Sequence, residues 1–227
     1  MSDKYLRFVV HSNLIVMGKL INGINGPFVG KVGTVVGSSW KGIPYMKAKY
    51  KARTPHITDK EKGNRSRFST AQLWLKPMLD FVRVGFKGYT PMVEGFIAAK
   101  SYLMKNAMEG TGAETIINPA KVKVSFGELP LSDNIAVKLI EGNKLEFTWD
   151  PETIRHRFVA HDQVMLMAYD IKNKEVKWTT TGQFRNVGRD ILELPEEKDR
   201  TYHVYLAFVA DDRSRQSDSV YLGEIKV

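Results

Sequence analysis

Histidines are the side chains best suited to acid–base or metal chemistry near neutral pH, and the five in this chain lie far apart. They are His11, His56, His156, His161 and His203. His156 and His161 would point to opposite faces of an extended strand, because they are five residues apart. Asp162 could orient His161 as a general base, but a solvated loop before a strand is the better interpretation of that pair. The spacing predicts no catalytic residues and no metal site.

The remaining chemistry to consider is a thiol nucleophile or a phosphate-binding loop. The chain has no cysteine, which excludes thiol nucleophiles, thiolate metal sites and disulfides. Gly30-Lys31 suggests a phosphate-binding loop, but that pattern needs a glycine and a Ser or Thr where Asn25 and Val32 stand. No serine lies in the context of a nucleophile elbow. We expect no cofactor, no small-molecule substrate and no enzyme activity.

The clearest functional signal is a basic segment, residues 41–67, in which Asp59 and Glu61 are the only acids. Its candidate polyanion-binding residues are Lys41, Lys47, Lys49, Lys51, Arg53, Arg65 and Arg67. The candidate base-stacking residues are Trp40, Tyr45 and Tyr50. In a strand over 43–51, lysines at alternate positions would share one face and could neutralise several phosphates. Lysines that protect a sheet edge, beside aromatics of a core, would give the same pattern, so both interpretations stay open.

The formal net charge of +9 comes from the first half of the chain. Residues 1–120 contain 18 Lys and Arg against 7 Asp and Glu, whereas residues 121–227 contain 16 against 18. The two halves therefore carry net charges of +11 and −2. This asymmetry favours one half that faces a polyanion, although a basic surface kept for solubility would give the same numbers.

A glycine-punctuated apolar run precedes the basic segment. Five glycines from Gly23 to Gly37 recur at intervals of 3 or 4 residues, but each would cost a helix about 1 kcal/mol relative to alanine. The β-branched residues between them favour strands over 28–40, followed by a turn at Lys41-Gly42 and a second strand over 43–51. These strands could pack against another subunit or donate a strand to it, or they could cover the same chain. The candidate assembly residues are Gly26, Gly30, Gly33 and Gly37.

Two helices joined by a short loop are predicted next. The polar stretch 56–67 indicates a loop, and a helix should begin at Ser69-Thr70, where either residue can cap it. Pro77 should kink or divide this helix, because proline has no backbone N–H to donate. A second helix should begin at Thr90-Pro91 and stop at Gly110. Together the two would form a helical hairpin.

The hydrophobic period changes to two after residue 120, which indicates strands. The predicted strands are 121–126, 134–141, 144–149, 162–170, 174–180, 188–194, 202–210 and 219–226. Short strands at this spacing favour an antiparallel β-sandwich. Trp149 on an early strand and the alternation of Tyr202, Val204 and Leu206 on a late one resemble a fibronectin type III or immunoglobulin-like module. That resemblance implies a fold but no activity.

Taken whole, the chain resembles an uncharacterised family of Bacteroidetes-type bacteria, known only as a domain of unknown function. The residues that carry the resemblance are Gly30-Lys31-Val32-Gly33, Val36-Gly37, Trp40-Lys41-Gly42, Gly85-Phe86, Asn118-Pro119, Val124-Ser125, Ser217, Ser219 and Tyr221. The resemblance spans about residues 17–227. It implies no activity, because none is known for the family.

We therefore predict an α+β protein in three parts. Residues 1–16 would be a poorly ordered extension, residues 17–118 a basic glycine-rich β segment with a helical hairpin, and residues 119–227 an immunoglobulin-like or fibronectin-III-like sandwich. The expected role is a non-catalytic structural or protein-interaction (assembly) protein. Its N-terminal half would contact a protein partner or a second copy.

The alternative role is binding of nucleic acid or another polyanion through residues 41–67. No run of about 18 apolar residues predicts a membrane span. The lack of a convincing signal peptide and of cysteine favours the cytoplasm.

Overall fold

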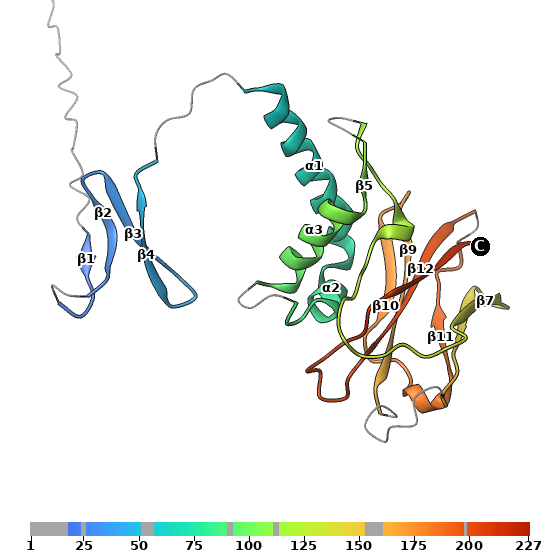
Figure 1. The fold of residues 1–227 in the computed structure, drawn as a ribbon. Coiled ribbons are helices and arrows are strands. Elements are labelled where there is room, and N and C mark those ends of the chain that lie inside the picture. Colours follow the sequence, from blue (N-terminus) through green and yellow to red (C-terminus); the bar gives the residue numbers. More distant parts are fainter. Residues whose placement is uncertain are drawn as a thin grey trace, which may run out of the picture. The chain divides into compact units, whose positions relative to one another are not determined.

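The computed structural model describes residues 18–23, 26–50, 57–89, 93–110, 114–152, 161–197 and 199–227. The chain divides into two compact units, residues 1–56 and residues 57–227, which we call the N-terminal unit and the C-terminal unit. The first contains the strands β1 to β4, and the second contains the helices and the strands from β5 onward (Figure 1). The predicted α+β class is confirmed.

The N-terminal unit contains a four-stranded antiparallel sheet in the order β1-β2-β3-β4. Its strands are β1 (Lys19–Leu20), β2 (Phe28–Val32), β3 (Val35–Trp40) and β4 (Ile43–Ala48). Lys41 and Gly42 form the predicted turn, with φ values of 47° and 83°, a left-handed conformation that glycine adopts readily. The strands predicted over 28–40 are confirmed. The next strand ends at Ala48, and its predicted last residue, Lys51, lies outside the described residues.

The first helix starts earlier than predicted. α1 (Asp59–Leu75) occupies most of the stretch 56–67, so the loop predicted there is wrong. Thr58 caps the helix by accepting a hydrogen bond from the Glu61 N–H at 3.3 Å, and acids in the first turn favour a helix N-terminus. An ion pair one turn apart, Arg65 with Glu61 at 2.9 Å, further supports a helix in this polar sequence.

Pro77 divides the helical stretch as predicted. The 3-10 turn η1 (Lys76–Met78) separates α1 from α2 (Leu79–Gly85), because Pro77 cannot donate the hydrogen bond that would continue α1. The second helix of the hairpin is α3 (Gly95–Asn106), whose predicted start at Thr90-Pro91 lies outside the described residues. A small antiparallel pair of strands, β5 (Met108–Glu109) and β6 (Ile116–Ile117), follows it.

Seven of the eight strands predicted after residue 120 are present, in two antiparallel sheets. One has the order β10-β9-β12-β13 and the other the order β11-β8-β7. The strands are β7 (Ala136–Ile140), β8 (Lys144–Thr148), β9 (Gln163–Asp170), β10 (Glu175–Thr179), β11 (Arg189–Glu193), β12 (Thr201–Val209) and β13 (Val220–Lys226).

The strand predicted over 121–126 is wrong. The 3-10 turn η3 (Pro119–Lys121) leads instead into an irregular segment. Val122 and Val124 in that segment are buried in the core beneath the helices. Their alternation with Lys121 and Lys123, which are more exposed, therefore reflects this packing and not a place in a sheet.

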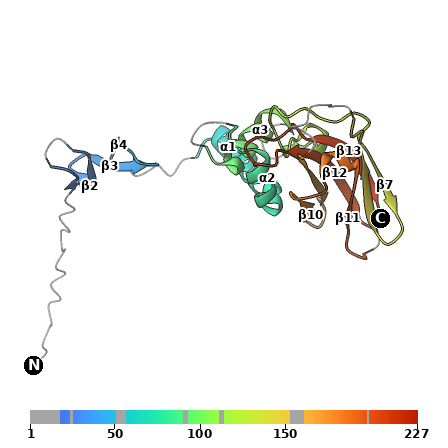
Figure 2. The same cartoon turned by 90° about the horizontal axis from the view of Figure 1, so that it is seen from below.

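Three layers form the C-terminal unit: the helices, the four-stranded sheet and the three-stranded sheet (Figures 1 and 2). The middle sheet supplies both hydrophobic cores. On β9, Met165 and Met167 belong to the core shared with the helices, whereas Val164 and Leu166 belong to the core shared with the other sheet. The helices thus share a core with the strands of the C-terminal unit, which differs from the predicted grouping of the helices with the glycine-rich segment in residues 17–118.

Candidate interaction surface

The register of the N-terminal sheet defines two unlike faces. Residues paired across strands share a face, and side chains alternate along each strand. Lys31 on β2 pairs with Val36 on β3, and Val36 pairs with Lys47 on β4. These pairings place three lysines and two aromatic side chains on one surface, which we call the lysine face. They are Lys19, Lys31, Trp40, Tyr45 and Lys47.

Lys49 extends the lysine face beyond the end of β4. Its N–H donates to the carbonyl oxygen of Thr34 at 2.8 Å, which continues the ladder between β3 and β4. Its side chain lowers the pKa of the Lys31 ammonium group, first through a side-chain hydrogen bond and then through like-charge repulsion. Residues 18–50 contain no Asp or Glu, so the sheet itself provides no carboxylate to balance these charges.

Aromatic rings accompany the cations on this surface. The Lys47 Nζ lies 5.8 Å from the centre of the Tyr45 ring, and the Lys41 Nζ lies 5.4 Å from the centre of the Trp40 ring. Trp40 is 51% exposed and Tyr45 is 42% exposed. Their rings are therefore accessible to a ligand that lies across the lysine face.

The opposite surface, which we call the apolar face, has no charged side chain among the described residues of the sheet. It carries Leu20, Phe28, Val32, Val35 and Met46. Met46 is 69% exposed and Val32 is 50% exposed. None of the described residues 18–50 contributes a side chain to a buried hydrophobic core. Because burying a large apolar side chain contributes about 1.5–3 kcal/mol, this face would gain substantially from being covered.

The candidate assembly glycines occur where the N-terminal sheet has no room for a Cβ atom or has a positive φ. A Cβ on Gly26 would lie 1.6 Å from the Ile21 carbonyl oxygen, and one on Gly37 would lie 2.1 Å from that of Phe28. Gly30 and Gly33 have φ values of 113° and 56°. Close approach within the sheet and turn geometry therefore account for these glycines, and a role in assembly stays a prediction.

The predicted polyanion-binding residues are distributed over both units. Lys47 and Lys49 lie on the lysine face, and Lys41 lies in the adjacent turn. Lys51 and Arg53 lie outside the described residues. Tyr50, a predicted stacking residue, follows Lys49 and is 79% exposed.

The two predicted arginines lie on α1 in the C-terminal unit, and both already have partners. Arg65 pairs with Glu61, and Arg67 donates to the Met104 carbonyl oxygen at 3.3 Å. Conversely, Lys19 and Lys31 were missed. They lie on other strands, so only the cross-strand register, a non-local property, could have placed them beside Lys47.

The boundary between the two units, after residue 56, separates the charge more sharply than the division after residue 120 does. Residues 1–56 contain nine Lys and Arg and one Asp, a net charge of +8. Residues 57–227 contain 25 Lys and Arg and 24 Asp and Glu, a net charge of +1. Almost all of the excess positive charge therefore belongs to the unit that carries the lysine face.

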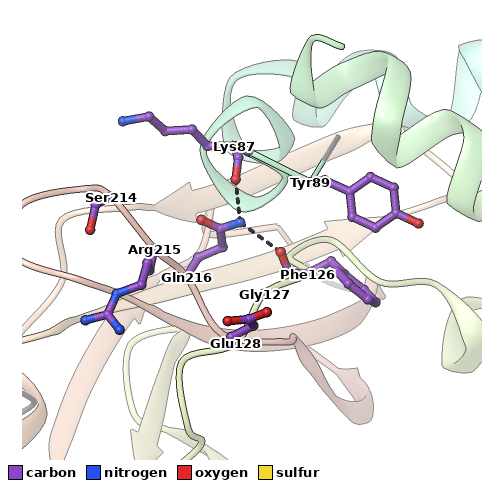
Figure 3. A pocket seen from close by; sticks show the side chains of 9 residues that line it. Lys87, Tyr89, Phe126, Gly127, Glu128, Ser214, Arg215 and Gln216 are labelled. Carbon is purple, nitrogen blue, oxygen red and sulfur yellow. Dashed lines mark hydrogen bonds between the residues drawn. The ribbon is translucent and has the colours of Figure 1, made fainter. Parts of the chain in front are cut away.

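A hollow of about 310 Å³ on the C-terminal unit is the main alternative site (Figure 3). Gln216 lies in it, and its Nε2 donates to the carbonyl oxygens of Lys87 and Phe126, each at 2.8 Å. The Lys87 side chain points away from Gln216, and the Ser214 hydroxyl donates to Asp212 at 2.6 Å. The described residues that line the hollow thus offer neither a nucleophile beside a base nor a cluster of carboxylates, and Gln216 links two carbonyl groups across it.

Several residues that carry the family resemblance meet beside this hollow. Ser125 Oγ lies 2.7 Å from the Ser217 carbonyl oxygen and 3.2 Å from the Gly85 carbonyl oxygen. Ser219 Oγ accepts from the Val124 N–H at 3.0 Å. These contacts join the end of α2, the irregular segment and the start of β13 into one hydrogen-bonded seam. We conclude that these motif residues fasten the helical layer to the middle sheet.

A buried ion pair lies at one end of the two-sheet core. Arg185 and Asp162 have side chains only 2% and 3% exposed, and their charged groups are 3.2 Å apart. Burial raises the pKa of the Asp162 carboxyl, and Arg185 counteracts that rise. The Arg185 guanidinium also lies 3.8 Å from the centre of the Phe208 ring. This arrangement is enclosed by protein, as befits a structural pair and not a site open to substrate.

The chain is thus a two-unit α+β protein with a basic sheet and a layered, nearly neutral β unit. A family model described as a family of unknown function, DUF6266, matches residues 27–223, and the chain belongs to that family. No curated protein and no solved structure matches the chain.

Among the described residues, no group of three or more His, Asp or Glu side chains could hold a metal ion. Within the same part of the chain, no helix is both long and apolar enough to cross a membrane.

Proposed function

We propose that this protein is a non-catalytic assembly protein, and that a second copy of the chain covers the apolar face of its N-terminal sheet. The observation that carries this proposal is an uncharged sheet face whose large apolar side chains are exposed. The structure describes 31 residues of this sheet, 18–23 and 26–50. They belong to a unit of 56 residues, and a unit this small is marginally stable alone, so a disulfide, a metal or oligomerisation helps to stabilise it. Cysteine is absent from the chain, and oligomerisation meets the same need.

Charge favours a second copy as the partner. Two apolar faces can stack without bringing lysines together, because Lys31 and Lys47 project from the opposite side of each sheet. Sheets that pack face to face lie about 10 Å apart, with their side chains interdigitating. Such a contact between identical faces is isologous and closes as a symmetric dimer.

Light scattering of the purified full-length chain over a range of concentrations tests this function. We expect association that strengthens with concentration, and we expect Met46→Glu combined with Val35→Glu to reduce it at least tenfold, since the change buries carboxylates in an apolar contact. Ile116→Glu combined with Ile191→Glu, at positions of the C-terminal unit that are 63% and 46% exposed, is the matched control and should leave association unchanged. A wild-type chain that stays monomeric throughout would overturn the proposal.

We also infer that the two sheets of the C-terminal unit form a sandwich of the fibronectin type III kind. The first, second and fifth of its seven strands make one sheet, and the others make the second in the order fourth, third, sixth, seventh. Trp149 packs edge-on against Phe208 on β12, with ring centres 5.6 Å apart. The helical layer on the outer face of the four-stranded sheet is an addition to that plan. An experimental structure that showed the strands in another order would contradict this inference.

A further inference from the structure

We propose that Lys31, Lys47 and Lys49 form a binding site for the phosphate backbone of single-stranded nucleic acid. The site lies on the lysine face, so it is independent of the apolar contact proposed above. Lys31 and Lys47 sit two strands apart, about 10 Å at the backbone, with Val36 between them. Lys49 follows Lys47 at about 7 Å along the chain. A row of this length suits an extended polyanion better than a single small ion.

Protection of a sheet edge does not explain this cluster. Lysines commonly guard exposed edge strands, and Lys47 on the outer strand β4 fits that role. Lys31 is not on an outermost strand, because β2 pairs with β3 at Lys31 and with β1 at Phe28 and Val29. Its side chain also approaches Lys49, a like charge, in a region of the chain without a carboxylate. An anion that bridges the two ammonium groups would convert that repulsion into attraction.

The aromatic side chains decide between kinds of polyanion. Tyr45 lies on β4 two residues before Lys47, on the same face, and its ring is accessible. Grooves that bind single strands combine backbone-tracking cations with rings on which bases stack. The bases of a duplex stack on one another, and lipid headgroups have no bases. The combination of lysines with Tyr45 and Trp40 therefore favours single-stranded nucleic acid.

Fluorescence anisotropy with labelled oligothymidylate of about 20 nucleotides measures this binding on the full-length protein. Affinity should fall steeply between about 50 and about 200 mM salt, because bound phosphates release counterions. Replacing Lys31, Lys47 and Lys49 by Gln should reduce the slope of log K against log salt by about 2, since each contact contributes about 0.7 on a single strand. Lys31→Gln alone should reduce it by about 0.7.

The C-terminal unit offers a control with the same loss of charge. Lys172, Lys174 and Lys177 are all exposed, and replacing all three by Gln should leave the slope unchanged. If this triple variant loses as much affinity as the first, binding reflects overall charge and the proposed site is wrong. Circular dichroism and light scattering of each variant must match the wild type. If the variant that lacks Lys31, Lys47 and Lys49 fails to fold, the salt dependence of Lys31→Gln alone tests the proposed site.

Two further arms separate the ligand classes. Tyr45→Thr should weaken binding to the single strand at least about fivefold, the equivalent of about 1 kcal/mol of stacking, and should leave duplex binding unchanged. If Tyr45→Thr weakened binding to duplex by the same factor, Tyr45 would not act by stacking on bases. Vesicles with anionic lipid should bind less tightly than the oligonucleotide. If vesicles bind more tightly and the lysine variants abolish that binding, the face is a membrane site and the proposal is overturned.

Discussion

The two units of this protein reach stability by different routes. In the C-terminal unit, Leu166 and Met167 are adjacent on β9, and both are fully buried, in different cores. In the N-terminal sheet, every residue of β4 is exposed, and the apolar side chains lie on a surface with no cover. The C-terminal unit is held by internal packing, whereas the N-terminal sheet leaves large apolar side chains exposed on its apolar face. Under the function proposed above, the sheet makes the contact and the layered unit serves as its scaffold.

The largest expected effect tests this contrast with the same substitution in each unit. Phe147→Ala removes a fully buried ring between the two sheets of the C-terminal unit and should lower the free energy of unfolding by about 3–5 kcal/mol. Phe28→Ala in the N-terminal sheet should leave the main unfolding transition in place and weaken self-association instead. Denaturant unfolding and light scattering measure the two quantities. A large loss of unfolding free energy in Phe28→Ala would mean that the units are not distinct.

A smaller effect is expected from tightening the seam between helices and sheet. A Cβ on Gly85 would lie 2.3 Å from the Val124 carbonyl oxygen and 3.0 Å from the Ser125 Cα. Gly85→Ala should therefore destabilise the C-terminal unit by about 1–3 kcal/mol, the usual cost of overpacking. Thermal unfolding measures it, and self-association should not change. Unaltered stability would show that the seam can shift to make room.

The smallest effect is a difference in response to pH. Burial lowers the pKa of His203, whose Nδ1 lies 2.9 Å from the Tyr221 hydroxyl. The unfolded chain then binds the proton first as pH falls below about 6.5, so stability should decrease from there through the lowered folded pKa. His203→Gln should flatten that decrease in thermal unfolding between about pH 5 and 7.

The N-terminal sheet provides the internal comparison for this pH series. Residues 18–50 contain no His, Asp or Glu, so self-association through the apolar face should stay constant over the same range. An association that changed with pH in step with the unfolding would place titratable groups from outside residues 18–50 in the contact.

Local signals in the sequence predicted much of the fold. The turn at Lys41-Gly42, the division at Pro77 and the alternation from Tyr202 to Leu206 each depend on neighbouring residues, and each is confirmed. The start of α1 was predicted incorrectly because the sequence there is polar, and the cap at Thr58 outweighs the lack of an apolar stripe. The strand predicted over 121–126 failed for the opposite reason, since tertiary packing produced its alternation.

Less of the candidate site than of the fold could be predicted from the sequence. Charge counting indicated the right part of the chain, and Lys47 and Lys49 were identified from their spacing. Lys31 precedes Lys47 by 16 positions, and only strand pairing brings it to the same face. The exposure of Met46 likewise depends on tertiary packing, because no other part of the described chain covers it. A local sequence pattern does not specify that.

One consequence follows from where the two cores draw their side chains. All their buried residues come from position 71 onward, so changes in the described N-terminal strands alter no buried packing there. That sheet can diversify, or be exchanged for another, while the layered body keeps its architecture. Under the proposed function, the N-terminal sheet is therefore the region where substitutions can alter recognition at low risk to the packing of the C-terminal unit.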